Sequence, residues 1–314
     1  MLKIGIMKFF NNSVSEIEWN SFFRISIALY CLLNLFSFWA DIPNILLENA
    51  FIKPEVIDLV FDGYSPTLVD LHHYLTNLGI TLAFDDFVYL VIYVYIFMLG
   101  LLLLGAFTRV AAIASFILQI IILKSMNYYL YGADYFASMA LFYCIIFPKG
   151  KFSLDYMIKE FQINQSSLKW SLLLLQAHLC VIYFFSGLDK GLGINWYNGE
   201  SVWRAVSGHN YNGLISLADY DLPNFIYISI GILTLITETF YPVFINYSKT
   251  RKLWLTLTIS MHVSIILFMG LYFFGTLMII LNVAAYYIPY LKKDNSNASS
   301  EYEKDLENQL AYEK

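Results

Sequence analysis

Charged residues are scarce in this chain: they make up 14% of its 314 residues, whereas 59% are hydrophobic. A typical soluble domain is about 25% charged and about 45–50% apolar. A soluble protein of this length needs more charge to cover its wetted surface, so the composition excludes an ordinary soluble domain. The formal net charge of -5 also argues against nucleic acid as a partner, because a surface that binds nucleic acid is basic.

Cysteine is rare as well, and the usual soluble-enzyme motifs are missing. Cys31, Cys144 and Cys180 each lie inside an apolar run without CxxC spacing, so we expect buried free thiols and neither a disulfide framework nor a zinc site. His72 and His73 are adjacent, but no further ligand spacing accompanies them, and we predict no metal site. The absence of GxGxxG, GxxxxGK[ST], HExxH and GxSxG arrangements leaves dehydrogenase, P-loop and zinc-peptidase functions without support.

Long apolar runs take the place of charge. A helix needs about 20 apolar residues to cross the hydrocarbon core of a bilayer, and eight stretches approach that length. They cover residues 19–40, 87–105, 110–124, 135–147, 168–188, 225–246, 253–269 and 271–288. The sequence therefore predicts an all-α, polytopic transmembrane helical bundle with about eight spans, seven or nine being the alternatives. Because the first run follows two acidic residues and no clear cleavage site, we expect a retained helix and not a cleaved signal.

Lysine and arginine predict the orientation, because segments that are moved across the membrane contain few of them. Residues 41–86 hold eight acidic residues against the single Lys53, and residues 189–223 contain only Lys190 and Arg204 as basic residues. We therefore expect these two segments to be long, structured outer loops and both termini to be cytoplasmic. The predicted domains are a transmembrane domain over residues 1–291 and a mobile cytoplasmic tail over residues 292–314.

Ionisable groups inside membrane spans are costly and are candidates for function. Lys190 lies at the outer end of the fifth run, and burial in an apolar pocket disfavours the charged form of a lysine, which can then act as a base. The alternative is a lysine that extends to the interface or pairs with Asp189. Glu238 and His262 lie inside the sixth and seventh runs, where the alternative role is an interhelical hydrogen bond that fixes packing. We predict Lys190, Glu238 and His262 as catalytic residues.

Further polar and aromatic residues surround these three in the sequence. We expect Gln176 and His178, within the fifth run, and Trp196 and Trp203, in the second outer loop, to contact the substrate. Asp134 should cap the outer end of the fourth run. A basic residue near the start of the first run, Arg24, should extend inward to the interface.

One stretch resembles a known family. The string from Gln176 through Gly199, with YFFSGLDK followed by NWYNGE, resembles the vitamin K-dependent gamma-carboxylase-like membrane family, whose members carry the HTTM domain. The shared features are an aromatic helix end, a small residue with a glycine, a lysine, and then Trp-x-x-Gly. Weaker similarity extends to the PKGKFSLD, ITETFYP and SMHVSIILFMGL segments, so that the resemblance covers most of the chain up to about Pro289.

The resemblance implies that Lys190 is the base that deprotonates a reduced quinone, the cofactor of the carboxylase. Two features depart from the carboxylase pattern: Asp189 replaces a basic residue before the lysine, and only a short polar tail follows the last apolar run, where the carboxylase has a large lumenal domain. Shorter bacterial members, similar to sporulation-delaying protein B, also lack that domain and help to mature a secreted peptide.

Two functions remain open at this point. The first is a membrane enzyme or maturation factor that acts on a lipid-soluble cofactor or a secreted peptide at the outer face of a bacterial inner membrane. Lys190 would be its base, and Glu238 and His262 would stabilise charge or relay protons. The second is a non-catalytic chaperone or export partner for a secreted peptide or protein, with the outer loops as its binding surface. A polar interior that contains Lys190 with Glu238 or His262 favours the enzyme.

Overall fold

The computed structural model describes residues 19–60, 66–207, 213–217, 220 and 222–291. All regular elements within these residues are helices, so the predicted all-α class is confirmed for the described part of the chain. The predicted tail at residues 292–314 lies outside the described residues. The chain divides into two compact units, residues 21–163 and residues 164–314 together with residues 1–20. We refer to them as the N-terminal and C-terminal units and describe each by itself.

Every predicted apolar run is helical. The helices are α2 (Trp19–Ser37), α6 (Phe84–Leu104), α7 (Thr108–Ser125), α8 (Gly132–Ile146), α10 (Gln165–Leu192), α12 (Asn224–Thr239), α14 (Arg251–Met269) and α15 (Tyr272–Tyr286). Six of the eight are long and apolar enough to cross a membrane, and α8 and α12 are shorter apolar helices. The protein is therefore an all-helical integral membrane protein.

The sixth run departs from a continuous helix. Its helix α12 ends at Thr239, and a short helix, α13 (Tyr241–Phe244), begins after Phe240 with Pro242 in its first turn. Proline has no N–H to donate and is best tolerated in the first turn of a helix. The backbone carbonyl of Thr237, near the break, accepts a hydrogen bond from the indole Nε1 of Trp254 at 2.9 Å. A side chain of α14 therefore satisfies a carbonyl close to the break.

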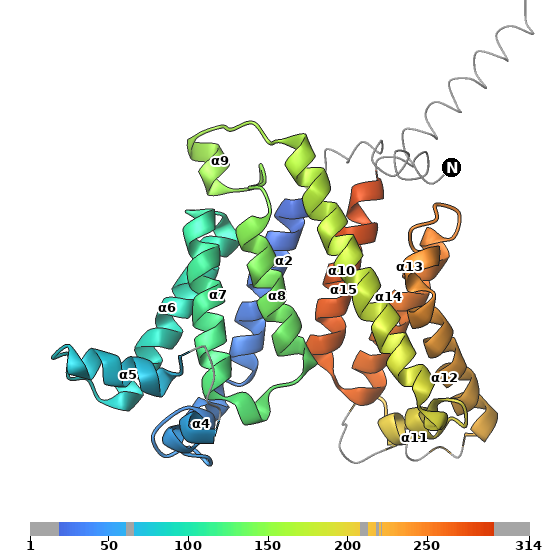
Figure 1. The fold of residues 1–314 in the computed structure, drawn as a ribbon, viewed down its shortest axis with the longest axis horizontal. Coiled ribbons are helices and arrows are strands. Elements are labelled where there is room, and N and C mark those ends of the chain that lie inside the picture. The colour runs from blue at the N-terminus through green and yellow to red at the C-terminus, as the bar shows by residue number, and fades with distance from the viewer. Residues whose placement is uncertain (1–18, 61–65, 208–212, 218–219, 221, 292–314) are drawn as a thin grey trace, which may run out of the picture. The chain divides into compact units, whose positions relative to one another are not determined.

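The N-terminal unit carries the predicted first outer loop on its helices (Figure 1). That loop forms η1 (Trp39–Asp41), α3 (Ile42–Ile45), α4 (Pro54–Val60) and α5 (Leu68–Asn77). Helix α5 packs on α6 and α7, and α4 packs on α7. The backbone N–H of Leu68 donates to the Ser125 hydroxyl of α7 at 2.8 Å, and Thr67 and Asp70 form a capping box at the start of α5. The prediction that this segment is structured is therefore confirmed for its described residues.

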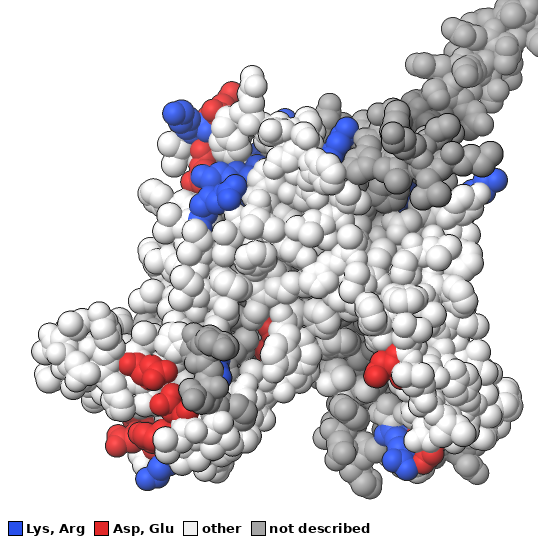
Figure 2. All heavy atoms as spheres, viewed as in Figure 1, with Lys and Arg blue, Asp and Glu red and all other residues white. Residues whose placement is uncertain are grey.

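Charge separates along the long helices of this unit. Acidic side chains gather over α4 and α5, basic side chains predominate around α9 (Leu154–Ile158) at the opposite end, and an uncharged band lies between (Figure 2). In the first turn of α8 the Asp134 carboxylate accepts from the Tyr131 N–H at 3.0 Å, so the predicted cap is confirmed.

Arg24 corrects an expectation. Its side chain is buried, at 5% exposure, and does not extend to the interface. The guanidinium donates to the backbone carbonyls of Leu102, Leu103 and Phe152. The last carbonyls of α6 have no partner within the helix. Arg24 donates to two of them, which it could not do if its side chain extended into water.

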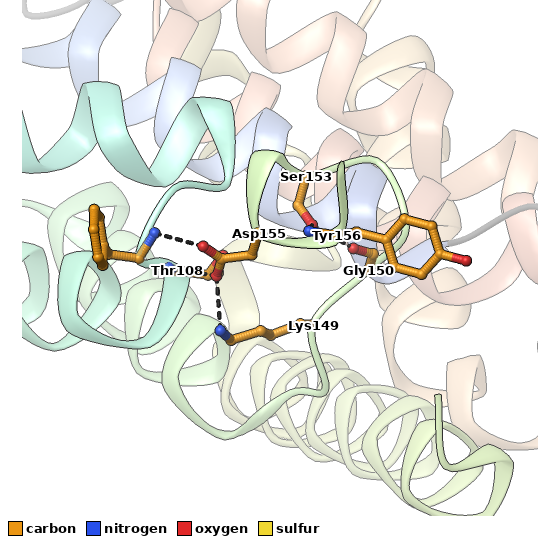
Figure 3. Close-up of polar contacts among 7 residues, drawn as sticks. Thr108, Lys149, Gly150, Ser153, Asp155 and Tyr156 are labelled. Atoms are coloured by element: carbon orange, nitrogen blue, oxygen red, sulfur yellow. Dashed lines mark hydrogen bonds and ion pairs between the residues drawn. The ribbon is translucent and has the colours of Figure 1, made fainter. Parts of the chain in front are cut away.

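The PKGKFSLD segment fastens the turn between α6 and α7 (Figure 3). The Asp155 carboxylate accepts from the N–H groups of Phe107 and Thr108 at 2.8 and 3.1 Å, from the Thr108 hydroxyl at 2.9 Å and from Lys149 Nζ at 2.7 Å. Ser153 caps α9 by accepting from the Tyr156 N–H at 3.3 Å. An anion at the first turn of α7 also faces the positive end of the helix dipole. The segment is thus a structural cap.

This cap should make stability depend on acid pH. Burial opposes ionisation of Asp155, but the hydrogen bonds from Lys149, Thr108 and Phe107 outweigh it and lower the pKa from 3.8 to about 2. A carboxylate with a lowered folded-state pKa contributes stability above pH 3.8 and loses it as the pH falls towards 2. We expect Asp155→Asn to lower the free energy of unfolding by about 1–2 kcal/mol at pH 7. The difference from wild type should shrink below pH 4.

Thermal unfolding in detergent, followed by helicity from pH 7 to pH 3, measures this difference. The exposed Glu160, replaced by Gln, is the matched control and should follow wild type at every pH. A difference for Asp155→Asn that stays constant or grows upon acidification would contradict the assignment.

Candidate functional site

The described part of the C-terminal unit is built around the apolar helices α10, α12, α14 and α15. Helix α10 packs against α12, α13 and α15, and α14 packs against α12 and α15 (Figure 1). Successive contacts along α10 meet decreasing residue numbers on α15, from Ala285 to Asn282, and likewise on α13 and α12, from Tyr241 to Glu238. Both neighbours are therefore antiparallel to α10. Polar side chains from all these helices point into the unit.

One face of α10 carries three of these polar side chains. Gln176, Tyr183 and Lys190 are spaced by seven residues, which places them on one side of the helix. Gly187 lies on the buried surface between them, and a Cβ added there would come within 2.5 Å of the Thr239 backbone nitrogen. Only glycine allows this approach of α10 to the end of α12. The small-residue pair of the motif, Ser186 and Gly187, thereby sets the distance between the two helices.

Lys190 uses this close approach. Its Nζ lies 2.6 Å from the Glu238 carboxylate of α12 and also donates to the Ser186 hydroxyl one turn earlier on α10. The side chain of Lys190 is 24% exposed and that of Glu238 is 8% exposed. Asp189 is exposed. Lys190 therefore pairs with the buried Glu238 of the neighbouring helix. It neither extends to the interface nor pairs with Asp189, which were the two alternatives.

The predicted second outer loop covers the lysine with an aromatic ring. The Trp196 ring, in η3 (Ile194–Trp196), lies with its centroid 5.6 Å from Lys190 Nζ, within the range of a cation–π contact. Two glycines bring this loop onto α12. A Cβ at Gly231 would lie 2.4 Å from the Trp196 carbonyl, and one at Gly199, which has a φ of +82°, would lie 2.8 Å from the Ile228 nitrogen. The Trp-x-x-Gly motif thus positions the ring, and α11 (Glu200–Ser207) follows directly.

Towards the middle of the helices lies a buried hydrogen-bonded group of four side chains. Tyr183 Oη is 2.7 Å from His262 Nε2 on α14, and Asn282 Nδ2 of α15 donates to Tyr183 Oη at 2.7 Å. The Tyr241 hydroxyl of α13 donates to Asn282 Oδ1 at 2.6 Å. The rings of Tyr183 and Tyr241 stack with centroids 4.2 Å apart. We call these four residues the tyrosine–histidine network.

The network lies close to the ion pair. Lys190 Nζ extends back to the level of Ser186, which is one helical turn from Tyr183. The charge of Lys190 is close enough to act on the His262 imidazole, and that of Glu238 on the Tyr183 hydroxyl. The three predicted catalytic residues, Lys190, Glu238 and His262, therefore lie in one polar region together with the Trp196 ring. Their catalytic roles stay predictions.

The other predicted substrate contacts lie elsewhere. Gln176 shares the face of Lys190 but donates to the Ala285 carbonyl at 2.8 Å and so ties α10 to α15. His178 is half-buried and lies about 140° around α10 from Tyr183, at about 100° per residue. Trp203 is 50% exposed on α11. The structure therefore joins Trp196 to the ion pair and leaves these three apart from it.

Sequence reasoning passed over Tyr183, Tyr241 and Asn282. The signal for Tyr183 was its position midway between Gln176 and Lys190 at helical spacing, and for Asn282 it was an amide inside an otherwise apolar run. Among the described residues no group of three or more His, Cys, Asp or Glu side chains could hold a metal ion.

Comparison with known proteins identifies the family. The sequence model of the HTTM domain matches residues 69–288, more than two thirds of the chain. No curated protein and no solved structure matches this chain. The match includes α10, α12, α14 and α15, and with them the ion pair, the Trp196 ring and the tyrosine–histidine network. This integral membrane protein therefore belongs to the HTTM domain family.

Proposed function

We propose that the protein is a membrane enzyme in which Lys190 and Glu238 remove a proton from a lipid-soluble cofactor, such as a reduced quinone, or from a secreted peptide. The observation that carries the proposal is the 2.6 Å pair between a part-exposed lysine and a buried glutamate. Burying a charged pair costs desolvation free energy. Ionisable residues within membrane helices therefore mark functional sites in most cases. A polar interior that contains both groups is also what the enzyme hypothesis required.

The pair can accept a proton without separating charge over a distance. As the substrate X–H approaches, Lys190 passes a proton to the Glu238 carboxylate and becomes a neutral amine. The amine then takes the substrate proton, so that X⁻ faces an ammonium group and a protonated Glu238. The new anion and the ammonium form an ion pair in a site of low dielectric, where their attraction is strong. The Trp196 ring lies within cation–π range of the Lys190 ammonium group and covers it on the side of the loop.

The proposed setting is a bacterial inner membrane. All eight apolar helices cross the bilayer, both termini are cytoplasmic, residues 1–291 form the membrane domain and residues 292–314 a cytoplasmic tail. The separation of acidic and basic side chains along the N-terminal unit supports this orientation (Figure 2). Labelling with a thiol reagent that cannot cross the membrane tests this orientation in intact cells. In a variant without the native cysteines, we expect Glu55→Cys to react and Lys249→Cys not to react.

A second candidate is the non-catalytic chaperone or export partner for a secreted peptide. The observation in its favour is the apolar surface beside the site, where Leu192, Ile194 and Trp203 are 89%, 76% and 50% exposed. An apolar segment of a secreted chain would find contacts there. In this case the ion pair only holds α10 and α12 together.

Mass spectrometry of the lipid extract and of the secreted peptides tests the two functions against each other. Cells that express wild type, Lys190→Met or the matched control Lys169→Met on α10 are compared for molecules present only with wild type. The enzyme predicts that Lys190→Met lowers the product at least about 100-fold, the usual effect of losing a general base, and that Lys169→Met keeps it. Full product from a Lys190→Met protein that inserts normally would exclude the enzyme, and loss upon Trp203→Ala instead would favour the partner.

A further inference from the structure

His262 has a buried nitrogen to spare. The residue is 2% exposed, and its Nδ1 has no hydrogen-bond partner among the residues that the structure describes. Buried polar atoms are nearly always paired, and an orphan indicates a missing water or ligand. What Nδ1 can offer to that molecule depends on the location of the imidazole proton, and the tyrosine–histidine network determines it.

Asn282 sets the direction of the hydrogen bonds. Its Nδ2 lies 2.8 Å from the Met278 carbonyl and 2.7 Å from the Tyr183 hydroxyl. A backbone carbonyl only accepts, so the amide nitrogen, and not the amide oxygen, must face Met278. Both N–H bonds of Asn282 are then used, and its Oδ1 accepts from the Tyr241 hydroxyl. The amide of Asn282 can therefore take one orientation only.

The proton positions on Tyr183 and His262 follow from Asn282. The oxygen of Tyr183 accepts from Asn282 Nδ2, and within the described residues the only other atom hydrogen-bonded to it is His262 Nε2. If the hydroxyl hydrogen of Tyr183 points to Nε2, that nitrogen accepts and the proton of a neutral imidazole lies on Nδ1. The opposite tautomer would strand both the Tyr183 hydrogen and the Nδ1 lone pair, which doubles the number of unpaired buried groups.

We propose that His262 is a neutral hydrogen-bond donor whose Nδ1–H binds an acceptor oxygen, a carbonyl or carboxylate of the molecule that is deprotonated at Lys190. This inference rests on the proposed function and adds a role to it. Tyr183 of α10, held by Asn282 of α15, orients the imidazole on α14. Lys190 Nζ extends back along α10 to the level of Ser186, about one turn from Tyr183. A donor fixed in advance stabilises negative charge as the substrate loses its proton. Tyr183 and Asn282 are positioning residues.

Nitrogen NMR of the imidazole tests the tautomer without any assay of activity. The chain has five histidines, so the His262 signals in ¹⁵N-histidine protein in lipid nanodiscs are assigned by their loss in His262→Gln. We expect a protonated Nδ1 and an unprotonated Nε2. Tyr183→Phe, which removes the donor to Nε2, should convert a large part of the population to the Nε2–H tautomer. The control Tyr241→Phe should leave Nδ1–H in place, because Met278 still orients Asn282. A proton on Nε2, or on both nitrogens, in wild type overturns the proposal.

A second comparison separates a ligand oxygen from a water. Protein purified with its membrane lipids is compared with protein stripped by repeated detergent exchange. A bound lipid-soluble molecule predicts that the Nδ1 shift moves upon stripping, whereas an unchanged shift with a cross-peak to water in both samples means a buried water only and overturns the ligand assignment. The two proposals can fail separately. If wild type carries the Nε2–H tautomer and Lys190→Met still loses the product as expected, this inference is refuted and the proposed enzyme function stands.

Discussion

Lys190→Met is expected to destabilise the protein by about 3 kcal/mol, towards the lower end of the range for breaking a buried ion pair. The variant leaves the Glu238 carboxylate, 8% exposed, without its cation. A buried charge that loses its partner must protonate or draw in water, and both cost free energy. The effect stays below the maximum because the lysine itself is 24% exposed. Unfolding in a denaturing detergent titration, followed by circular dichroism, measures the loss.

Two double variants separate structure from chemistry. Lys190→Met combined with Glu238→Leu removes both charges and should recover most of the lost stability, because apolar pairs often replace buried ion pairs at little cost. Lys190→Gln combined with Glu238→Gln keeps a hydrogen bond between the helices but cannot accept a proton, so it should be stable and inactive. If Lys190→Met alone unfolds like wild type, the contact contributes nothing to the fold. If the Gln pair retains the product, the ion pair is not the base.

Gly187→Ala is expected to cost close to 3 kcal/mol, the upper end for adding a methyl group to a packed interior. The new Cβ would lie 2.5 Å from the Thr239 nitrogen and hydroxyl oxygen and 2.9 Å from its Cα. Backbone cannot move aside as the end of a flexible side chain can, so α10 and α12 must separate. Because Glu238 precedes Thr239, the separation should also lengthen the contact between Lys190 and Glu238 and lower the yield of product.

Gly191→Ala, one turn later on α10, is the matched control. Its Cβ would meet only the Tyr197 hydroxyl at 3.7 Å, an ordinary contact. Replacing a helical glycine by alanine without a clash should be neutral or stabilise by up to about 1 kcal/mol. Equal melting temperatures for the two variants in the same detergent would show that the approach at Gly187 is not needed.

The eight apolar runs predicted the helices well because a bilayer penalises unpaired backbone so strongly that composition alone decides the structure. Pairing between spans is a different matter. Glu238 and Lys190 are 48 residues apart, and neither charged residue indicates from the sequence which residue of the other helix it faces. The glycines do carry that information, since Gly187 and Gly231 mark where backbones touch. Their meaning becomes clear only once the partner, Thr239 or Trp196, is known.

Arg24 and His262 show two further limits of the sequence. An arginine near the end of a span looks the same whether it reaches water or a neighbouring helix, and only the position of the α6 carbonyls decides between them. His262 was recognised as a candidate because it is ionisable and mid-span. The direction of its hydrogen bonds depends on the backbone carbonyl of Met278. Any residue type supplies such a carbonyl, so the sequence does not mark this position.

The break after Thr239 has a consequence for the lipid around the protein. Helix α12 has 16 residues, so it is about 24 Å long at about 1.5 Å per residue, against a hydrocarbon thickness of about 30 Å. On the proposed topology, in which α12 crosses the membrane, so short a helix would draw the nearby lipid headgroups towards it and thin the bilayer locally. An amphiphilic molecule with its polar head among those lipids would have less hydrocarbon to cross before it met Glu238, so local thickness itself would set how readily the site is reached.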